Sequence, residues 1–409
     1  MIHDVGGPSA TAGLFSDDGG ADGRTHGRID MSAEDTIIQG FKDRMKEQGF
    51  EGLRNEIILR GLCSGCGACS AVCPRDIIEY GSDGLPRVKG GAECVPCGLC
   101  AIHCPRSFLN TEEVEKGLFE GEKDELGHHI RILAARAKDQ ELQGIAQDGG
   151  MVSAILKHAF GKNSIDAAAV CLGDERFIGS PFLARRWEEA KRASRSKYNL
   201  SPNLVALRWA RQERLEKLAL VGLPCHIAAF RKLEFYGPKS LAQRVAFTVG
   251  IFCSENFCER LITEFLPARG VDPTKITKLN IKGMFKVEAG GQLFEIPLPQ
   301  MSSVINPGCL PCRDFTAEFA DISVGAVGAP EGWCTVITRT PKGDAILKAL
   351  LDEGVLETGD LTKPKTLRRM SVSKRKRGNL KLIEIMSREA ALPFRSIELP
   401  AEEKGGEEK

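Results

Sequence analysis

A stretch rich in cysteine, CSGCGACSAVCP from Cys63 to Pro74, is repeated further along the chain as CVPCGLCAIHCP from Cys94 to Pro105. Both copies have the spacing C-x2-C-x2-C-x3-C-P, which is typical of bacterial ferredoxins with two [4Fe–4S] clusters. Three closely spaced thiolates bind one cubane, and the fourth cysteine binds the other cubane. The repeat therefore predicts a two-cluster ferredoxin-type segment over residues 55–110.

This spacing rule assigns every cysteine of the repeat to one of two clusters. Cluster one takes Cys63, Cys66, Cys69 and Cys104, and cluster two takes Cys94, Cys97, Cys100 and Cys73. Gly65, Gly67 and Gly98 are expected to let the backbone turn tightly around the sulfurs. Zinc is the alternative metal, but zinc sites favour paired C-x2-C knuckles over four cysteines in a row followed by proline.

Composition narrows the class of protein. The chain has 409 residues, of which 42% are hydrophobic and 27% charged, as expected for a globular protein with two or three domains. A net charge of +1 gives no indication of nucleic acid or an anionic membrane as partner. No apolar run reaches the roughly 18 residues of a transmembrane helix, and the N-terminus does not resemble a signal peptide. Fifteen cysteines in this context indicate metal ligands in a reducing cytoplasm.

The chain divides into segments of different character. Residues 1–31 lack periodicity and are expected to be a disordered extension, with Met31 as a better beginning for the protein. A helical lead-in (32–54) precedes the ferredoxin-type segment, and an acidic helical linker (111–127) follows it. A larger domain is expected in two parts, 129–215 and 216–395. The acidic tail, 396–409, is expected to be disordered.

Strand and helix patterns alternate after residue 128, which predicts an α/β domain with a largely parallel, mixed sheet. Buried strands are expected at 129–137, 164–173, 217–225, 244–253, 320–328 and 334–340. Helices are expected at 150–160, 203–215, 226–234, 257–268 and 342–354, and a hairpin at 286–296.

Four further cysteines stand at expected element ends or in a loop of this domain. Cys225 and Cys253 end two expected strands, and Cys309 and Cys312 form the loop GCLPC. Because sites in α/β sheets gather at the carboxyl ends of strands, these four could bind a third [4Fe–4S] cluster. Their spacing fits buried structural cysteines equally well. Cys171, Cys258 and Cys334 are interpreted as core thiols, and His103 and His226 as packing residues.

Two motifs could bind a phosphate or a flat ring. Gly149 and Gly150 precede an expected helix, whose N-terminus suits a phosphate, although a plain helix start has the same pattern. Ser194, Ser196, Lys197 and Tyr198 could hold a diphosphate and stack on a ring, or form a solvated loop. The basic run at 372–381 is either a solvated face or a binding site for an acidic partner.

Six ordered motifs together resemble one known family. They read QDGGMVSAIL, SKYNLSP, GLPCHIAAFRK, GIFCSENF, CLPCRDFTAEFADISVGAVG and EGWCTVITRTPKG, and span about residues 129–380. The resemblance is to the beta subunits of coenzyme F-420 (F420) hydrogenases and dehydrogenases. It implies one FAD, a coenzyme F-420 site on the flavin face and a cluster held by the domain's own cysteines. FAD would be bound by Gln147, Gly149, Gly150, Ser153, Ser194, Ser196, Lys197 and Tyr198.

The resemblance implies an enzyme subunit that exchanges hydride between coenzyme F-420 and FAD and passes single electrons through the clusters. A flavin suits this task because it links two-electron and one-electron chemistry. The expected partner is a catalytic alpha subunit or a redox complex, as for the beta subunit of formate dehydrogenase. The input subunit of a membrane-linked F-420 dehydrogenase and an F-420 hydrogenase beta subunit are alternatives, and so is a non-catalytic ferredoxin-type adaptor. The absence of a GxGxxG fingerprint weighs against NADH as donor. Arg192, Arg195 and Lys197 are candidates for the anionic coenzyme F-420 tail.

Overall fold

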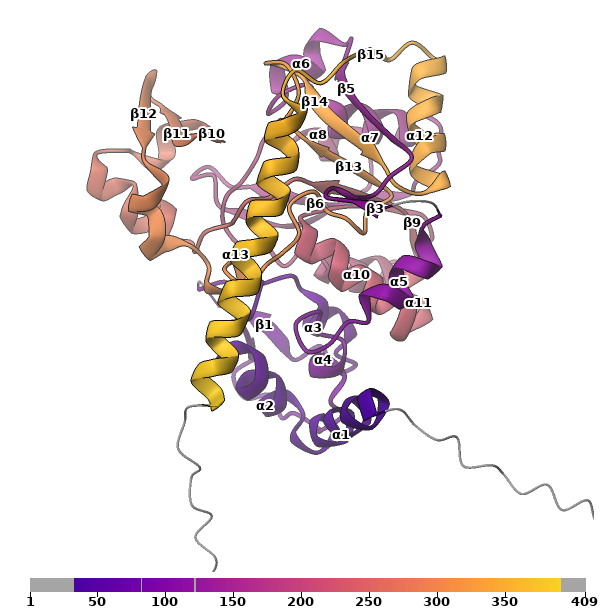
Figure 1. Cartoon of the computed structure of the whole chain (residues 1–409), viewed down its shortest axis with the longest axis vertical. Coiled ribbons are helices and arrows are strands. Elements are labelled where there is room, and N and C mark those ends of the chain that lie inside the picture. Colours follow the sequence, from indigo (N-terminus) through magenta and orange to yellow (C-terminus); the bar gives the residue numbers. More distant parts are fainter. Residues whose placement is uncertain (1–32, 82, 121–122, 391–409) are drawn as a thin grey trace, which may run out of the picture.

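An eight-stranded sheet forms the centre of the protein (Figure 1). The computed structural model describes residues 33–81, 83–120 and 123–390, so the predicted extension at 1–31, Ser32 and the predicted tail at 396–409 lie outside the described residues. In spatial order the strands are β15 (Leu356–Gly359), β5 (Arg131–Ala137), β14 (Cys334–Thr338), β13 (Ile322–Gly325), β9 (Val245–Ile251), β8 (Leu218–Gly222), β6 (Ala167–Gly173) and β7 (Gly179–Ala184).

The sheet is mixed, as expected, but only its centre is parallel. The inner strands β13, β9, β8 and β6 pair in parallel. On one side β14, β5 and β15 add antiparallel strands, and on the other side β7 forms an antiparallel hairpin with β6. All five residues of β8 are buried, which agrees with its unbroken apolar sequence, because a central parallel strand is covered on both faces.

Helices cover both faces of the sheet and create two apolar cores. The first face carries α6 (Gln140–Ile145), α7 (Met151–Gly161), α8 (Trp187–Lys191) and α12 (Pro341–Asp352). The second face carries α9 (Val205–Gln212), α10 (Pro224–Tyr236) and α11 (Lys239–Ala242). The larger domain therefore has three layers, α/β/α, and the α/β class predicted from the alternating pattern is confirmed.

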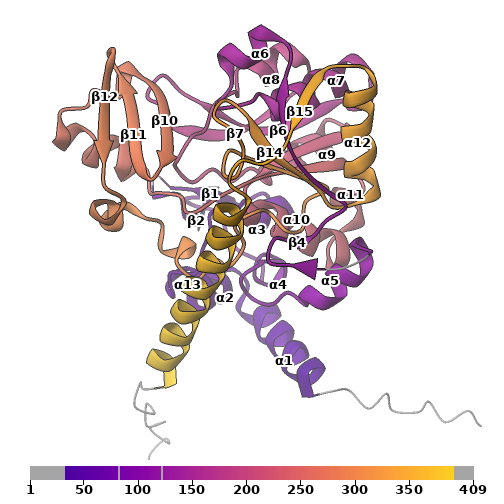
Figure 2. The same ribbon diagram turned by 45° about the horizontal axis from the view of Figure 1, so that its top comes forward.

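The ferredoxin-type segment packs against the second helical layer (Figures 1 and 2). The lead-in forms α1 (Ala33–Gln48) and α2 (Phe50–Leu53). A π-helical turn (Arg54–Ile58) joins it to the segment, which contains α3 (Ala68–Val72), β1 (Ile78–Tyr80), β2 (Pro86–Val88) and α4 (Leu99–Ile102). Cys66, Ala68 and Val72 share one apolar core with residues of α9 and α10. The segment is thus fixed to the α/β domain by a continuous core rather than by a loose linker.

Three sequence expectations need correction. The strand expected at 217–225 ends at Gly222, because Pro224 starts α10 and suits the first turn of a helix; Cys225 therefore lies in that turn. The helix expected at 257–268 is a π-helical turn (Leu261–Phe265) followed by a 3-10 turn (Pro267–Arg269), since Pro267 interrupts it.

The third correction concerns the linker at 111–127, which is helical only in its first part. Helix α5 covers Thr111–Leu118, and a short hairpin of β3 (Lys123–Asp124) and β4 (Gly127–His128) follows. The buried guanidinium of Arg339 donates hydrogen bonds to the carbonyls of Leu126 (2.9 Å) and His128 (2.7 Å). These bonds tie the hairpin to the end of β14.

Two larger features lacked a clear sequence signal. The expected hairpin at 286–296 is part of a separate three-stranded sheet of β10 (Ile276–Lys282), β11 (Met284–Ala289) and β12 (Gln292–Ile296), flanked by 3-10 turns at Pro273–Lys275, Leu298–Val304 and Pro307–Cys309. This sheet stands apart from the central sheet in both views (Figures 1 and 2).

The second feature is α13 (Pro364–Ala390), a helix of 27 residues that contains the whole basic run at 372–381. It runs past the α/β domain towards the ferredoxin-type segment (Figures 1 and 2). Despite its length, neither it nor any other helix in the described part of the chain is long and apolar enough to cross a membrane.

Candidate functional site

The cysteines assigned to cluster two gather around one cavity. Cys73, Cys94, Cys97 and Cys100 line it together with residues of α2 and α4. Cys73 belongs to the first run of the repeat, so the crossing of the fourth cysteine is present in the folded chain. Gly98 starts α4 with a φ of 69°, and an added Cβ there would lie 2.6 Å from the backbone of Met45, so only glycine fits this turn.

The cysteines assigned to cluster one form a second, more buried group. Burial raises the pKa of Cys63 and of Cys66 to about 12, and the nearby Cys104 adds to both shifts. The Tyr80 hydroxyl, at the end of β1, lies 3.2 Å from the sulfur of Cys69. Such thiols keep their protons unless a metal displaces them, since buried thiolates need positive partners.

Within the described ranges, no three His, Cys, Asp or Glu side chains meet closely enough to hold a single metal ion. A cubane makes a different demand, because each of its four thiolates binds a different iron. Four cysteine sulfurs are the donor set of a [4Fe–4S] cluster, and in the cluster-two group they surround one cavity.

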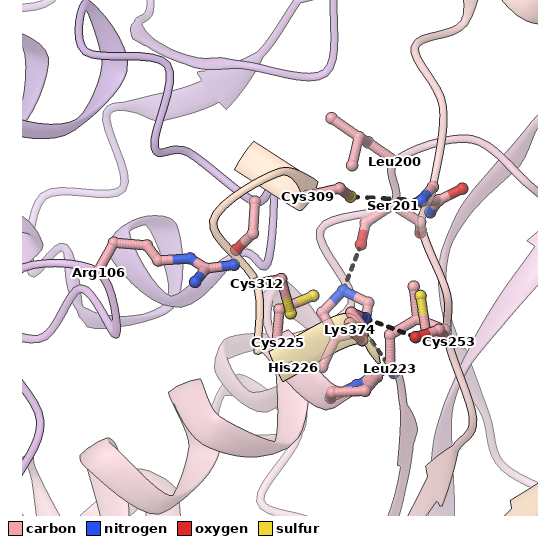
Figure 3. A pocket seen from close by; sticks show the side chains of 13 residues that line it. Arg106, Leu200, Ser201, Leu223, Cys225, His226, Cys253, Cys309, Cys312 and Lys374 are labelled. Carbon is pink, nitrogen blue, oxygen red and sulfur yellow. Dashed lines mark hydrogen bonds between the residues drawn. The ribbon is translucent and has the colours of Figure 1, made fainter. Parts of the chain in front are cut away.

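A third group of cysteines forms inside the α/β domain (Figure 3). Cys225, Cys253, Cys309 and Cys312 line one cavity. Cys225 comes from the first turn of α10, Cys253 follows β9 by two residues, and the other two come from the loop after the small sheet. The structure thus brings together the four residues for which spacing alone left two interpretations open.

Two basic side chains line the same cavity. Lys374 of α13 is buried and donates a hydrogen bond to the carbonyl of Cys253, and Arg106 donates one to the carbonyl of Gly308 (3.0 Å). Burial alone would raise the pKa of Cys312, but Lys374 and Arg106 lower it below the ordinary thiol value. The positive charges therefore favour a thiolate at Cys312, whereas burial raises the pKa of Cys225, Cys253 and Cys309 above the ordinary thiol value.

Of the two histidines next to predicted ligands, His226 has both ring nitrogens engaged by the backbone. Nδ1 of His226 accepts a hydrogen bond from the backbone N–H of Leu223 (3.0 Å), and Nε2 lies 2.9 Å from the carbonyl of Ser201. His103 is buried, and burial lowers its pKa to about 4. Both therefore act as neutral packing residues in this structure.

The three cysteine groups lie in series. Gly308, next to Cys309, is so close to Cys63 that an added Cβ would lie 2.0 Å from the Cys63 carbonyl oxygen. Cys225 and Cys66 are near enough for their charges to interact. Cluster one thus lies between cluster two, whose Cys97 is exposed, and the third group inside the α/β domain.

The predicted flavin residues mostly bind other parts of the chain. The Gln147 amide donates to the carbonyl of Leu279 in β10 (2.9 Å), and its oxygen accepts the backbone N–H of Ser196 (3.1 Å). The ammonium of Lys197 donates to the carbonyls of Ala193 (2.8 Å), Ser194 (2.7 Å) and Arg195 (3.1 Å). Gln147 therefore bridges the loop at 194–202 and the small sheet, and Lys197 fastens this loop to the residues just before it.

The other predicted flavin residues also have structural roles. The ring of Tyr198 packs against Phe257 and Phe285 in the small-sheet core. An added Cβ at Gly149 would lie 2.9 Å from the Ala135 carbonyl, and Gly150 caps α7 with a φ of 74°. Ser153 lies in the first turn of α7 and is partly exposed.

Sequence reasoning overlooked the role of the end of the SKYNLSP motif. The amide of Asn199 bonds the backbone of Gly179 in both directions, at 2.7 and 2.9 Å. The backbone N–H of Leu204 donates to the carbonyl of Cys66 (3.1 Å). The motif therefore joins the cluster-one loop to the central sheet, and the proline in its sequence was the one hint of a fixed conformation.

Comparison with known proteins identifies the parts of the chain. The model "4Fe-4S dicluster domain" matches residues 62–109. Two models of the family "Coenzyme F420 hydrogenase/dehydrogenase, beta subunit" match as well: the N-terminal model at residues 132–208 and the C-terminal model at residues 215–364.

Named relatives agree with these matches. The chain is 38% identical over 239 residues to the coenzyme F420 hydrogenase subunit beta of Methanothermobacter thermautotrophicus, covering 57% of this chain and 85% of the relative. It is 34% identical over 327 residues to the coenzyme F420-dependent sulfite reductase of Methanocaldococcus jannaschii, covering 75% of this chain but 49% of that protein. A chain of the F420-reducing [NiFe] hydrogenase complex from Methanosarcina barkeri superposes with a TM-score of 0.63 at 31% identity, covering 65% of this chain and 95% of that chain.

Fold and cysteine groups together define an iron–sulfur electron-transfer protein, in which a two-cluster ferredoxin-type segment is fused to an α/β domain. More particularly, the chain belongs to the coenzyme F420 hydrogenase/dehydrogenase beta-subunit family. The resemblance noted from the sequence motifs is therefore confirmed.

Proposed function

We propose that this protein exchanges hydride between coenzyme F-420 and FAD and passes single electrons through three [4Fe–4S] clusters to or from a partner subunit. The observation that carries the proposal is the serial arrangement of three groups of four cysteines, from the exposed Cys97 to the interior of the α/β domain. Family membership supplies the coenzyme, since relatives are named for F420.

The third cysteine group would be the point where electrons enter from the flavin. Tyr198, at the edge of the predicted flavin site, is close enough to Cys253 for their charges to interact. Cluster two would be the exchange point with the partner, because Cys97 and the neighbouring Val95 are exposed. Electron transfer between protein chains needs a redox centre near the surface, and cluster two meets this need.

FAD would be held at the start of α7 and beside the loop at 194–202. FAD supplies the conversion between two-electron hydride transfer and one-electron transfer. The backbone N–H groups of Val152 and Ser153, with the hydroxyl of Ser153, would offer donors to a phosphate, whereas the N–H of Met151 faces the sulfur of Cys334. The ion pair between Lys282 and Asp148 (3.3 Å) and the Gln147 bond to Leu279 hold the small sheet beside this helix start. These contacts keep the proposed flavin residues in one place.

The anionic tail of coenzyme F-420 would need exposed positive charge nearby. Arg195 donates to the carbonyl of Thr277 (2.6 Å), and Lys197 is directed into its own loop. Arg192 is exposed, and no ion pair or hydrogen bond joins its side chain to the rest of the described chain. Arg192 is therefore the strongest candidate of the three for contact with the tail.

The proposed partner is the catalytic subunit of a formate dehydrogenase, with a hydrogenase or a membrane-linked dehydrogenase complex as alternatives. The named relatives include hydrogenase and dehydrogenase subunits. Among them is a subunit of the F(420)H(2) dehydrogenase of Methanosarcina mazei, 30% identical over 73% of this chain and 85% of its own. The family models themselves cover hydrogenases and dehydrogenases alike.

The test uses anaerobically purified protein. Acid precipitation should release FAD into the supernatant, and adding reduced coenzyme F-420 to the intact protein should bleach the flavin absorbance. Protein that contains iron and sulfide but releases no flavin would instead support the alternative of a non-catalytic adaptor.

A further inference from the structure

The cavity of the third cysteine group is lined by permanent positive charge from two distant parts of the chain. Among the residues that line it, Lys374 and Arg106 are the two that carry a permanent positive charge. Lys374 stands on α13, more than one hundred residues after Cys253, and Arg106 belongs to the ferredoxin-type segment. Two distant parts of the chain thus deliver positive charge to one small space.

The position of Lys374 is fixed by close packing. Gly378, one helical turn further along α13, lies so close to the loop of Cys312 that an added Cβ would be 2.6 Å from its carbonyl oxygen. The same face of the helix buries Lys374, whose ammonium donates to the Cys253 carbonyl. The packing of the helix therefore fixes the position of the Lys374 ammonium beside the cysteines.

Arg106 has an equally constrained position between two cysteine groups. It follows Cys104, a predicted ligand of cluster one, by two residues, and its guanidinium points towards Cys312 (Figure 3). It also interacts electrostatically with Cys63 and Cys104. Its Nε is enclosed by protein and has no hydrogen-bond partner among the described residues, so one donor remains for a group in the cavity.

Neither cation is neutralised by an ion pair within the described ranges. The carboxyl that interacts electrostatically with Lys374 is Asp314, which accepts the backbone N–H of Glu318 (2.9 Å). Burying an unpaired cation is costly, so such a residue normally faces an anion. A [4Fe–4S] cubane held by four thiolates is an anion in both redox states and gains one negative charge on reduction.

We propose that Lys374 and Arg106 compensate the charge of the third cluster and raise its reduction potential, and that Arg106 does the same for cluster one. This inference rests on the third cluster of the proposed function. Nearby positive charge stabilises the reduced, more negative state more than the oxidised state, so it raises the potential of the cluster. The third cluster then becomes a better acceptor for electrons from the flavin side.

The experiment is a redox titration of the full-length protein followed by electron paramagnetic resonance, with iron counted in every sample. Wild-type protein comes first: about eight irons and no third signal would refute the third cluster itself, apart from the role of the cations. The variants are Lys374→Met, Lys374→Arg, Arg106→Met and, as the matched control, Lys376→Met, which removes an exposed charge from the same helix.

Lys374→Met should lower the reduction equilibrium constant of the third cluster at least tenfold, or about 59 mV for one electron. Lys374→Arg and Lys376→Met should stay close to wild type. Arg106→Met should lower the potentials of both the third cluster and cluster one, whereas Lys374→Met should affect the third cluster alone.

An unchanged potential in Lys374→Met protein with full iron content would overturn the proposal. If Lys374→Met protein loses about four irons, the Lys374→Arg variant shows whether the third cluster needs the positive charge or the shape of lysine. Retained iron in the arginine variant means that the cluster needs the charge, as proposed. Loss of the same irons in both variants, or an equal fall in potential in both, means that lysine acts by its shape, and the proposal fails.

Discussion

Replacing Gly67 with alanine should weaken the joint between the cluster-one loop and the α/β domain. Gly67 starts α3 with a φ of 95°, in the left-handed region. An added Cβ would lie 2.4 Å from the carbonyl oxygen of Pro202, in the loop that follows Tyr198. The nearest atoms, from Pro202 and Leu204, all belong to the backbone, so they cannot turn aside as a side chain would.

The cost has two parts. A residue with a Cβ in the left-handed region loses about 1–2 kcal/mol. Forcing extra volume into a closely packed contact costs about 1–3 kcal/mol more. The sum, about 2–5 kcal/mol, is a large share of the 5–15 kcal/mol that typically stabilises a folded protein. The electron path should suffer as well, because this joint holds Cys66 near Cys225.

Two other glycines separate the contributions. Gly91 has a φ of 74° but no atom within 4 Å of an added Cβ, and Gly90 has neither a positive φ nor a close atom. We expect Gly90→Ala to behave as wild type, Gly91→Ala to lose about 1–2 kcal/mol and Gly67→Ala to lose clearly more. The assay is thermal unfolding under anaerobic conditions, followed by cluster absorbance. Equal losses of stability in Gly67→Ala and Gly91→Ala would show that the contact with Pro202 adds no cost, and the reasoning would be refuted.

Three further predictions concern the clusters themselves. Replacing Cys309 and Cys312 with serine should remove about four of twelve irons and spare the ferredoxin-type pair; unchanged iron would remove the third cluster from the proposal. Cys97→Ser should damage cluster two, so delivery of electrons to an external acceptor should fall sharply. Reduced coenzyme F-420 should still bleach the bound FAD. Loss of this bleaching while FAD stays bound would contradict the proposed order of electron carriers. Tyr80→Phe should lower the reduction potential of cluster one by roughly 20–40 mV, because the hydrogen bond from the hydroxyl to the Cys69 thiolate is lost. This bond should stabilise the reduced cluster more than the oxidised cluster by about 0.5–1 kcal/mol. A redox titration in which only the other clusters shift would contradict this prediction.

The local parts of the protein could be predicted from sequence because they depend on neighbours along the chain. The C-x2-C-x2-C-x3-C-P spacing indicates a cubane loop through the reach of a few residues, and buried apolar runs such as β8 indicate central strands. The family was also evident, because six motifs in one order are specific. Boundaries were less certain where a proline acts: Pro224 moved Cys225 from a strand end into a helix, and Pro267 broke a helix into turns.

Only the tertiary structure decided which distant residues meet. The order β8, β9, β13 places the start of α10, the end of β9 and the loop of Cys309 and Cys312 around one cavity, and no spacing rule connects them. The same holds for Lys374, which belongs to a basic run that the sequence left open as a solvated face or a binding site for an acidic partner. Its neighbours Lys376 and Arg377 do face solvent, but the packing of Gly378 against the Cys312 loop turns Lys374 inward. Helical periodicity determines which residues share a face of the helix. Which of these faces is buried depends on the surface against which the helix packs.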